Sequence, residues 1–163
     1  INPMYKPAWD NLIKYREDIA RYDTVYAVKA MQGMAHEKHH AMEHMYPSRQ
    51  EIIEKNGGYD PKQLHHIQRL EDFLERYING ETYEKCLIPL KKEYLKAVKS
   101  GVYQLEGARR VAEESLKHID EMANQYKEKH KDDEPSSFVD ILLNETQGVI
   151  IKAYITKKIK EDN

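Results

Sequence analysis

Apolar residues recur every three or four positions along most of this chain, which is the spacing of one face of an α-helix. No segment alternates apolar and polar residues in the way that a half-buried β-strand does. The pattern therefore predicts an all-α fold, a multi-helix bundle of about five to seven helices. The expected helices cover residues 7–20, 24–45, 48–56, 61–79, 89–100, 105–130 and 136–159.

The helix expected at residues 61–79 has the clearest local signals. Asp60 is a residue type that caps helix N-termini, Pro61 suits the first helical turn, and Gly80 suits the position after the last turn. Either of the two serines at 136 and 137 caps the last helix in the same way. On the 24–45 helix, the expected apolar face contains Ala27, Met31, Met34, Ala35, Met42 and Met45.

The composition is that of a single polar helical domain. At 163 residues the chain has the length of one domain, and 33% of its residues are charged. No apolar run approaches the length that spans a bilayer, so we expect no membrane partner. With a net charge of −2 the chain has no overall positive potential that would attract nucleic acid, so only local basic patches could bind it. The single cysteine, Cys86, fits a reducing compartment, and we expect a cytoplasmic protein.

A basic stripe, Lys62, His66 and Arg69, marks the 61–79 helix. The separations of four and three residues place these groups on one line of the helix. The stripe borders the apolar face, where a packed surface meets water. Such an edge suits the binding of phosphate, and an ordinary solvated edge with an internal salt bridge is the alternative. The apolar face comprises Leu64, Ile67, Leu70, Leu74 and Ile78, and the acidic face that points away comprises Glu71, Asp72 and Glu75.

The 24–45 helix carries Lys29, Gly33, His36 and His40 along one face. Glycine inside a helix costs about 1 kcal/mol relative to alanine. Gly33 therefore indicates the close approach of another backbone or a ligand, or else a tolerated helix glycine, and the sequence leaves both interpretations open. On the first interpretation, Lys29 and Gly33 belong to a binding surface.

The segment His36-Glu37-Lys38-His39-His40 matches H-E-x-x-H, in which two histidines one helical turn apart bind zinc beside a general-base glutamate. The five-residue match is weak by itself, because the glycine of the extended motif is absent and no strand edge is predicted to hold a peptide. A histidine-rich solvated stripe is the favoured interpretation, so we predict no catalytic residue and no metal ligand in this chain. A zinc-dependent hydrolase stays as an alternative.

Four short elements, taken in order, carry a resemblance to a known family. Gly33-Met34-Ala35 is similar to a Gly-x-Ala element, and residues 62–70 are similar to a Lys-x-x-x-His-x-x-Arg-Leu helix. Residues 98–106 are similar to an Ile-Arg-x-Gly stretch that precedes an acidic helix start, and residues 133–143 to the beginning of a terminal helix. With these elements the chain resembles the C-terminal helical region of predicted nucleotidyltransferases of the DNA polymerase beta superfamily, of the RNA-ligase-associated type.

The resemblance implies that residues 1–163 form a single helical domain, the C-terminal part of a longer nucleotidyltransferase. The Gly-Ser turn and the Asp-x-Asp pair that hold Mg²⁺ in that family are not in this sequence, so an upstream α/β catalytic domain would supply them. The intact enzyme would transfer a nucleoside monophosphate from a nucleoside triphosphate to an acceptor, with nucleic acid as a further expected partner. This chain alone would be inactive.

The resemblance also implies roles for the residues that match it. Lys62 and Arg69 would neutralise phosphate charge, and His66 would donate a hydrogen bond to phosphate. Lys29 would line the opposite wall of the site beside Gly33. These five residues form the expected nucleotide-binding set.

Two positions depart from the family pattern. Lys99 stands where the family tends to have arginine, so bidentate phosphate recognition is not expected there. Met34 stands in place of the usual tyrosine. The alternative from another functional class is a stand-alone helical binding or interaction module without catalysis.

Overall fold

The computed structural model describes residues 3–161, and all the regular structure in that range is helical, from a short 3₁₀ helix, η1 (Pro3–Tyr5), onward. No strand occurs among these residues, so the predicted all-α fold is confirmed. The α-helices are α1 (Lys6–Lys14), α2 (Arg16–Ala20), α3 (Thr24–Glu43), α4 (Gln50–Lys55), α5 (Pro61–Ile78), α6 (Tyr83–Cys86), α7 (Lys92–Lys99), α8 (Leu105–Lys129) and α9 (Ser137–Glu161).

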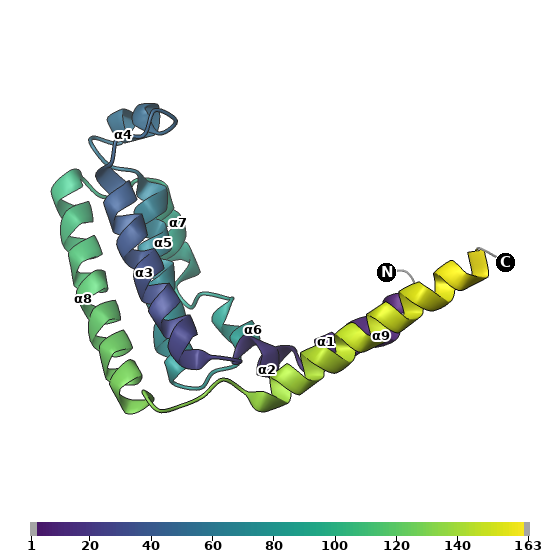
Figure 1. Cartoon of the computed structure of the whole chain (residues 1–163). Helices are drawn as coiled ribbons and strands as arrows, with labels where there is room; N and C mark the ends of the chain where they lie inside the picture. The colour runs from purple at the N-terminus through teal and green to yellow at the C-terminus, as the bar shows by residue number, and fades with distance from the viewer. Residues whose placement is uncertain (1–2, 162–163) are drawn as a thin grey trace. The chain divides into compact units, whose positions relative to one another are not determined.

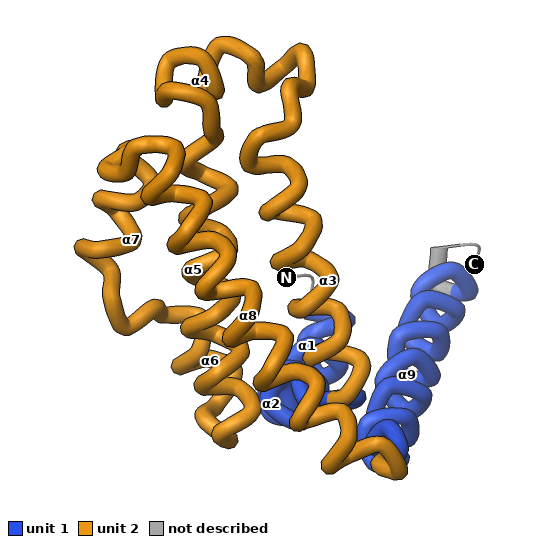
Figure 2. The backbone as a smooth tube through the Cα atoms, turned by 90° about the vertical axis from the view of Figure 1, so that its left-hand side faces the viewer, with its two compact units in different colours: residues 1–24, 134–163 blue, residues 25–133 orange. Residues whose placement is uncertain are grey.

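The chain divides into two compact units, which Figure 2 shows in different colours. The first unit comprises residues 1–24 and 134–163, and the second comprises residues 25–133. Each of these units packs a set of buried residues of its own. The single helical domain over residues 1–163 stays a prediction from the sequence.

In the second unit, the long helices α3, α5 and α8 lie lengthwise beside one another, and α7 packs on α5 (Figure 1). Helices α3 and α8 run antiparallel. The Gln32 side chain donates a 2.6 Å hydrogen bond to Asp120, and toward the opposite ends Arg109 binds Glu43 through two guanidinium nitrogens. The faces turned toward one another bury Val28, Met31, Ala35, Met42, Tyr59, Leu64, Ile67, Leu74, Tyr77, Val98, Ala108, Ala112, Leu116, Ile119 and Ala123.

The predicted apolar face of α3 is right at Met31, Ala35 and Met42 and wrong at Met34 and Met45, which are both largely exposed. Helix α3 ends at Glu43 and not near Met45, so the chain leaves the helix before that side chain reaches the core. Met34 lies one residue before the buried Ala35, and a step of one residue turns the side chain about 100° around the helix.

The start of α5 is held by the buried carboxylate of Asp60. Its Oδ1 accepts a 2.9 Å hydrogen bond from the backbone N–H of Lys62, which makes it the N-cap of the helix. Its Oδ2 accepts hydrogen bonds from the side chains of Arg49 and Gln63. The backbone N–H of Asp60 donates to the carbonyl of Met42 at 2.8 Å. The predicted cap is therefore present, and it determines where the basic stripe begins.

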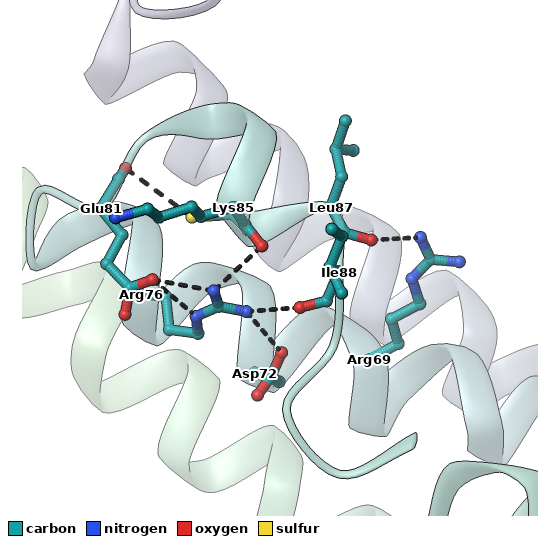
Figure 3. A network of polar contacts seen from close by, with 8 residues as sticks. Arg69, Asp72, Arg76, Glu81, Lys85, Leu87 and Ile88 are labelled. Carbon is teal, nitrogen blue, oxygen red and sulfur yellow. Dashed lines mark hydrogen bonds and ion pairs between the residues drawn. The ribbon is translucent and has the colours of Figure 1, made fainter. Parts of the chain in front are cut away.

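Arg76 is only 7% exposed and ties the connector after α5 to that helix (Figure 3). Its guanidinium donates hydrogen bonds to the Glu81 carboxylate at 2.8 and 3.1 Å and to the carbonyls of Lys85 and Ile88 at 2.9 and 2.8 Å. An ion pair with Asp72 adds an N–O contact of 3.4 Å. The hydrogen bonds from Arg76 hold the pKa of Glu81 below its ordinary value. The connector is thereby fixed on the side of α5.

In the first unit, α9 packs on α1 and on the preceding η1. The rings of Tyr15 and Phe138 meet edge to face with centroids 5.2 Å apart, and the Ser136 N–H donates to the carbonyl of Tyr22. The Oγ of Ser136 accepts from the Val139 N–H at 3.4 Å, which decides between the two serines expected as the cap. The residues buried in this unit are Ala8, Val139, Leu142 and Thr146.

Two predicted helix boundaries are wrong. The helix expected over residues 7–20 is divided at Tyr15, whose backbone lies at φ −105° and ψ 21°, although no glycine or proline marks the break. The helix expected to open at Pro89 begins instead at Lys92. Across the described residues, none of the helices has the length and apolar content needed to cross a membrane.

Candidate functional site

The basic stripe lies on α5 as the sequence predicts. Lys62 and Arg69 are exposed and His66 is half-buried, so the stripe follows the border between the packed face and water. Of the predicted apolar residues beside it, Leu64, Ile67 and Leu74 are fully buried, and Leu70 and Ile78 are half-buried.

Basic side chains from two further helices lie around the stripe. His66 is close enough to Lys38 of α3, and His65 to Lys99 of α7, for their charges to act on the imidazoles. The rings of His65 and His66 meet edge to face with centroids 5.4 Å apart. Helices α3 and α7 thus extend the stripe beyond α5. We name the whole group the basic cluster; it consists of Lys38, Lys62, His65, His66, Arg69 and Lys99.

Burial and the surrounding positive charge lower the pKa of both imidazoles in the basic cluster. Desolvation is the largest cause for His65, followed by the charges of Lys99, Arg69 and Lys62. Desolvation is also the largest cause for His66, followed by its neighbours in the cluster. Both rings are therefore mostly neutral at pH 7, and they offer hydrogen-bonding nitrogens rather than charge.

Few acidic groups offset the basic cluster. Lys38 donates a 2.8 Å hydrogen bond to its neighbour Glu37. Among the described residues, no carboxylate is bonded to the ammonium groups of Lys62 or Lys99, and Nδ1 of His65 is buried without a hydrogen-bond partner. A buried polar atom without a partner costs about 1–3 kcal/mol, which a fold rarely carries without a reason. The cluster therefore combines positive charge with an unsatisfied buried nitrogen.

Arg69 also has a structural contact. One of its terminal nitrogens donates a 3.2 Å hydrogen bond to the carbonyl of Leu87 in the segment between α6 and α7, as Figure 3 shows. A guanidinium carries five N–H donors, so one such bond orients the group and leaves others for a ligand.

Lys29 and Gly33 lie on a different stretch of α3. At 1.5 Å per residue, Lys29 is about 14 Å from Lys38 along the helix axis, and it is exposed. A Cβ atom at Gly33 would meet no atom within 4 Å, so nothing among the described residues requires glycine there. Lys38 and Lys99 act on the imidazoles of the stripe region, whereas nothing in the described residues links Lys29 or Gly33 to it.

Replacing Gly33 with alanine is expected to raise the free energy of unfolding by up to about 1 kcal/mol, because alanine favours the helical backbone and the methyl group has room. Urea denaturation measures the change. Gly80→Ala is the control: that site is equally open, but its φ of +83° strains an L-residue, so stability should fall. A loss of stability in Gly33→Ala would contradict the open surroundings. If Gly33→Ala lost nucleotide binding and kept its stability, the interpretation of Gly33 as part of a ligand site would be restored.

The H-E-x-x-H segment does not assemble a three-ligand site. His36 Nε2 lies 2.9 Å from Asp120 Oδ1, and His40 stacks on another histidine one turn away. The hydrogen bond from Lys38 lowers the pKa of Glu37. Within residues 3–161, no three His, Cys, Asp or Glu side chains come together in a way that could hold a metal ion. The zinc-hydrolase alternative gains no support from this geometry.

A polar network that the sequence does not predict lies on the acidic side of α5. The Ser115 hydroxyl donates a 2.6 Å hydrogen bond to Glu71, whose other oxygen lies 2.8 Å from His118 Nδ1, and Tyr94 donates to Gln68 at 2.9 Å. The signal available in the sequence is a serine in the middle of the apolar face of α8. The Ser115 hydroxyl contacts the carboxylate and not the imidazole, so this network does not have the arrangement that activates a nucleophile.

A cavity of about 150 Å³ adjoins this network and has the opposite character to the basic cluster. Three carboxylates and one ammonium group line it, together with Tyr94, whose pKa is raised mainly by burial. Such a lining repels a phosphate, and its three carboxylates do not come together in a way that could hold a metal ion. Its residues are Gln68, Glu71, Asp72, Glu75, Leu90, Lys91, Tyr94 and Leu95.

No family model, curated protein or solved structure matches the chain. The resemblance to nucleotidyltransferases stays a prediction from four sequence elements. Of the residues in those elements, the structure places Lys62, His66 and Arg69 on one line of α5 and Lys99 beside His65.

Proposed function

We propose that the basic cluster binds the phosphates of a nucleoside triphosphate. The observation that carries the proposal is the convergence of six basic side chains from α3, α5 and α7, in which every charged neighbour acting on His65 and His66 is positive. The four charged groups Lys38, Lys62, Arg69 and Lys99 repel one another and disfavour the fold, so a bound anion would relieve a cost that the protein otherwise carries.

The side chains of the basic cluster differ in what they offer a phosphate. Lys62 and Lys99 supply compact charges, and Arg69 supplies a planar fork of donors oriented by its bond to Leu87. The neutral rings of His65 and His66 supply single N–H donors. These groups neutralise and position phosphate oxygens, and none of them is required to move a proton.

Within a nucleotidyltransferase, this binding would place the triphosphate beside an upstream α/β catalytic domain. That domain would contribute the carboxylates and Mg²⁺ for transfer of the nucleoside monophosphate to the acceptor, whether nucleic acid or a smaller molecule. The expected cytoplasmic location belongs to the same proposal.

The double variant Lys62→Ala/Arg69→Ala is expected to weaken ATP binding by the chain at least about tenfold, since a hydrogen bond to a charged group contributes about 1.5–3 kcal/mol. Calorimetric titration measures the affinity. The dependence of log K on log salt concentration should also become shallower, because fewer counterions are released. Circular dichroism should show unchanged helicity, since both side chains are exposed.

A matched control removes two positive charges from another helix. Arg110 and Lys117 are exposed on α8, and Arg110→Ala/Lys117→Ala should leave ATP affinity within about twofold if the effect is local rather than one of net charge. If both double variants bound ATP with the affinity of the unmodified chain, the basic cluster would not be the ATP-binding site. If Lys62→Ala/Arg69→Ala lost helicity, the role of the stripe would be to stabilise the fold.

The stand-alone binding module is the competing proposal, and the acid-lined cavity beside Tyr94 is the observation that favours it. The two proposals differ in what the gene encodes before Ile1. A strand-rich segment with Gly-Ser and Asp-x-Asp there supports the transferase, and a start codon immediately before Ile1 supports the module.

A further inference from the structure

Helix α9 leaves an extensive apolar surface in water. Nine of its large apolar side chains are between 39% and 58% exposed. These residues are Phe138, Ile141, Leu143, Val149, Ile150, Ile151, Tyr154, Ile155 and Ile159. They are distributed around the helix, and four of them, Ile141, Ile151, Ile155 and Ile159, lie on the side away from the buried residues of α9.

The side of α9 opposite its buried residues has the periodicity of a helix-pairing seam. Ile141, Asn144, Gly148, Ile151 and Ile155 follow one another at separations of three, four, three and four residues. That alternation is the heptad spacing that keeps one line of a helix against a partner helix. The buried residues Val139, Leu142 and Thr146 occupy the other side, so α9 has two distinct contact faces.

The charges along α9 are separated by sign. Its first half carries Asp140 and Glu145 and no basic residue, and its second half carries Lys152, Lys157 and Lys158 among its basic residues. Two copies side by side in the same direction would align like charges. Two copies in opposite directions would align unlike charges, which is how flanking charges select orientation in paired helices.

The positions of these charges agree on one centre for an antiparallel pair. Asp140 and Lys158 lie nine residues either side of residue 149 on one flank of the seam, and Glu145 and Lys152 lie on the other flank, centred between residues 148 and 149. Gly148 is within one residue of both centres, and a Cβ atom there would meet nothing within 4 Å. Glycine at the crossing point of two helices lets their backbones approach closely.

We infer that the exposed side of α9 binds the same side of α9 in a second copy of this chain, with the two helices antiparallel and crossing at Gly148. The seam isoleucines are buried between the copies, and Glu145 of each copy faces Lys152 of the other. The interaction surface lies entirely in the first unit and is independent of the nucleotide-binding proposal for the second.

Sedimentation equilibrium of the full chain tests the inference, with a dimer as the expected result. Ile151→Glu/Ile155→Glu should weaken dimerisation at least a hundredfold, because two charges per copy would be buried without partners. Ile52→Glu/Leu90→Glu places the same charges on exposed apolar positions of the second unit and should leave the dimer intact. Circular dichroism verifies that both variants remain helical. A chain that is monomeric at all concentrations would overturn the inference.

Charge reversal tests the orientation. Glu145→Lys and Lys152→Glu should each weaken the dimer, and the two changes combined should restore it, because the antiparallel pair would again be complementary. Failure of the double variant to recover would contradict the antiparallel arrangement.

Cysteine cross-linking tests the centre independently, with the unmodified chain as control because its Cys86 is buried. Gly148→Cys should cross-link with itself. Ile141→Cys should cross-link only with Ile155→Cys, since in an antiparallel pair residues 141 of the two copies lie about 20 Å apart. Self-cross-linking of Ile141→Cys would show a parallel pair and overturn the inference. A monomer that sediments with anionic phospholipid vesicles would assign the surface to a membrane interface instead.

Discussion

Replacing Tyr59 with alanine is expected to lower the free energy of unfolding by about 3–5 kcal/mol, the usual range for a buried aromatic residue truncated to alanine. Tyr59 is completely buried immediately before α5, and its hydroxyl donates a 2.8 Å hydrogen bond to the carbonyl of Tyr103 before α8. Burial also raises the pKa of Tyr59, so the hydroxyl stays protonated and able to donate. Urea denaturation followed by circular dichroism measures the loss.

Tyr59→Phe separates the ring from the hydroxyl. It keeps the packing and removes one hydrogen bond, so the expected loss is about 1 kcal/mol. If Tyr59→Phe were as damaging as Tyr59→Ala, the hydrogen bond to Tyr103 and not the buried ring would be the dominant contribution. If neither variant lost stability, the buried position of Tyr59 would be wrong.

Asp60→Ala is expected to cost roughly 3 kcal/mol. Loss of an N-cap typically costs about 1 kcal/mol, and loss of the buried partner of Arg49 adds to it. Breaking a fully buried ion pair costs about 3–5 kcal/mol, but the Arg49 side chain is 29% exposed and regains water, so its share is smaller.

Asp60→Asn is the matched variant, because its amide oxygen still accepts the hydrogen bond from the Lys62 N–H while the charge opposite Arg49 is removed. An intermediate loss of stability is expected, measured by the same denaturation. Equal stability of Asp60→Ala and the unmodified chain would mean that the cap and the ion pair contribute nothing.

Variants of Tyr59 and Asp60 also help to show whether the basic stripe binds a ligand or stabilises the fold. Tyr59 and Asp60 stand just before residues 62–70, the element that resembles the nucleotidyltransferases, and the structure gives both a role in holding the start of α5. Variants of either should therefore lose ATP binding only together with stability. Variants of Lys62 and Arg69 should lose binding while stability is retained.

The helices with strong local signals could be predicted from the sequence to within about two residues. Helix α5 begins at Pro61 after the Asp60 cap, and α8 and α9 begin and end close to their expected limits. Capping and apolar spacing act between residues a few positions apart, so a local pattern contains most of the information. The interruption at Tyr15 has no such local signal.

The candidate site could be predicted only in part. Lys62, His66 and Arg69 belong to one helix, and their alignment follows from helical geometry alone. Lys38 and Lys99 join them because α3 and α7 pack beside α5, and that packing depends on contacts between residues distant in the sequence. The polar network around Glu71 was missed for the same reason, because its partner Ser115 is on α8.

By itself the sequence determined that the chain is helical, where its principal helices lie and which side of α5 is buried, because these properties arise from interactions within one or two helical turns. Only the tertiary structure decided that the chain packs as two units, that six basic groups from three helices share one surface, and that one side of α9 is left uncovered within the first unit. Those outcomes depend on which apolar faces meet, and apolar burial is non-directional, so no single helix specifies its partner.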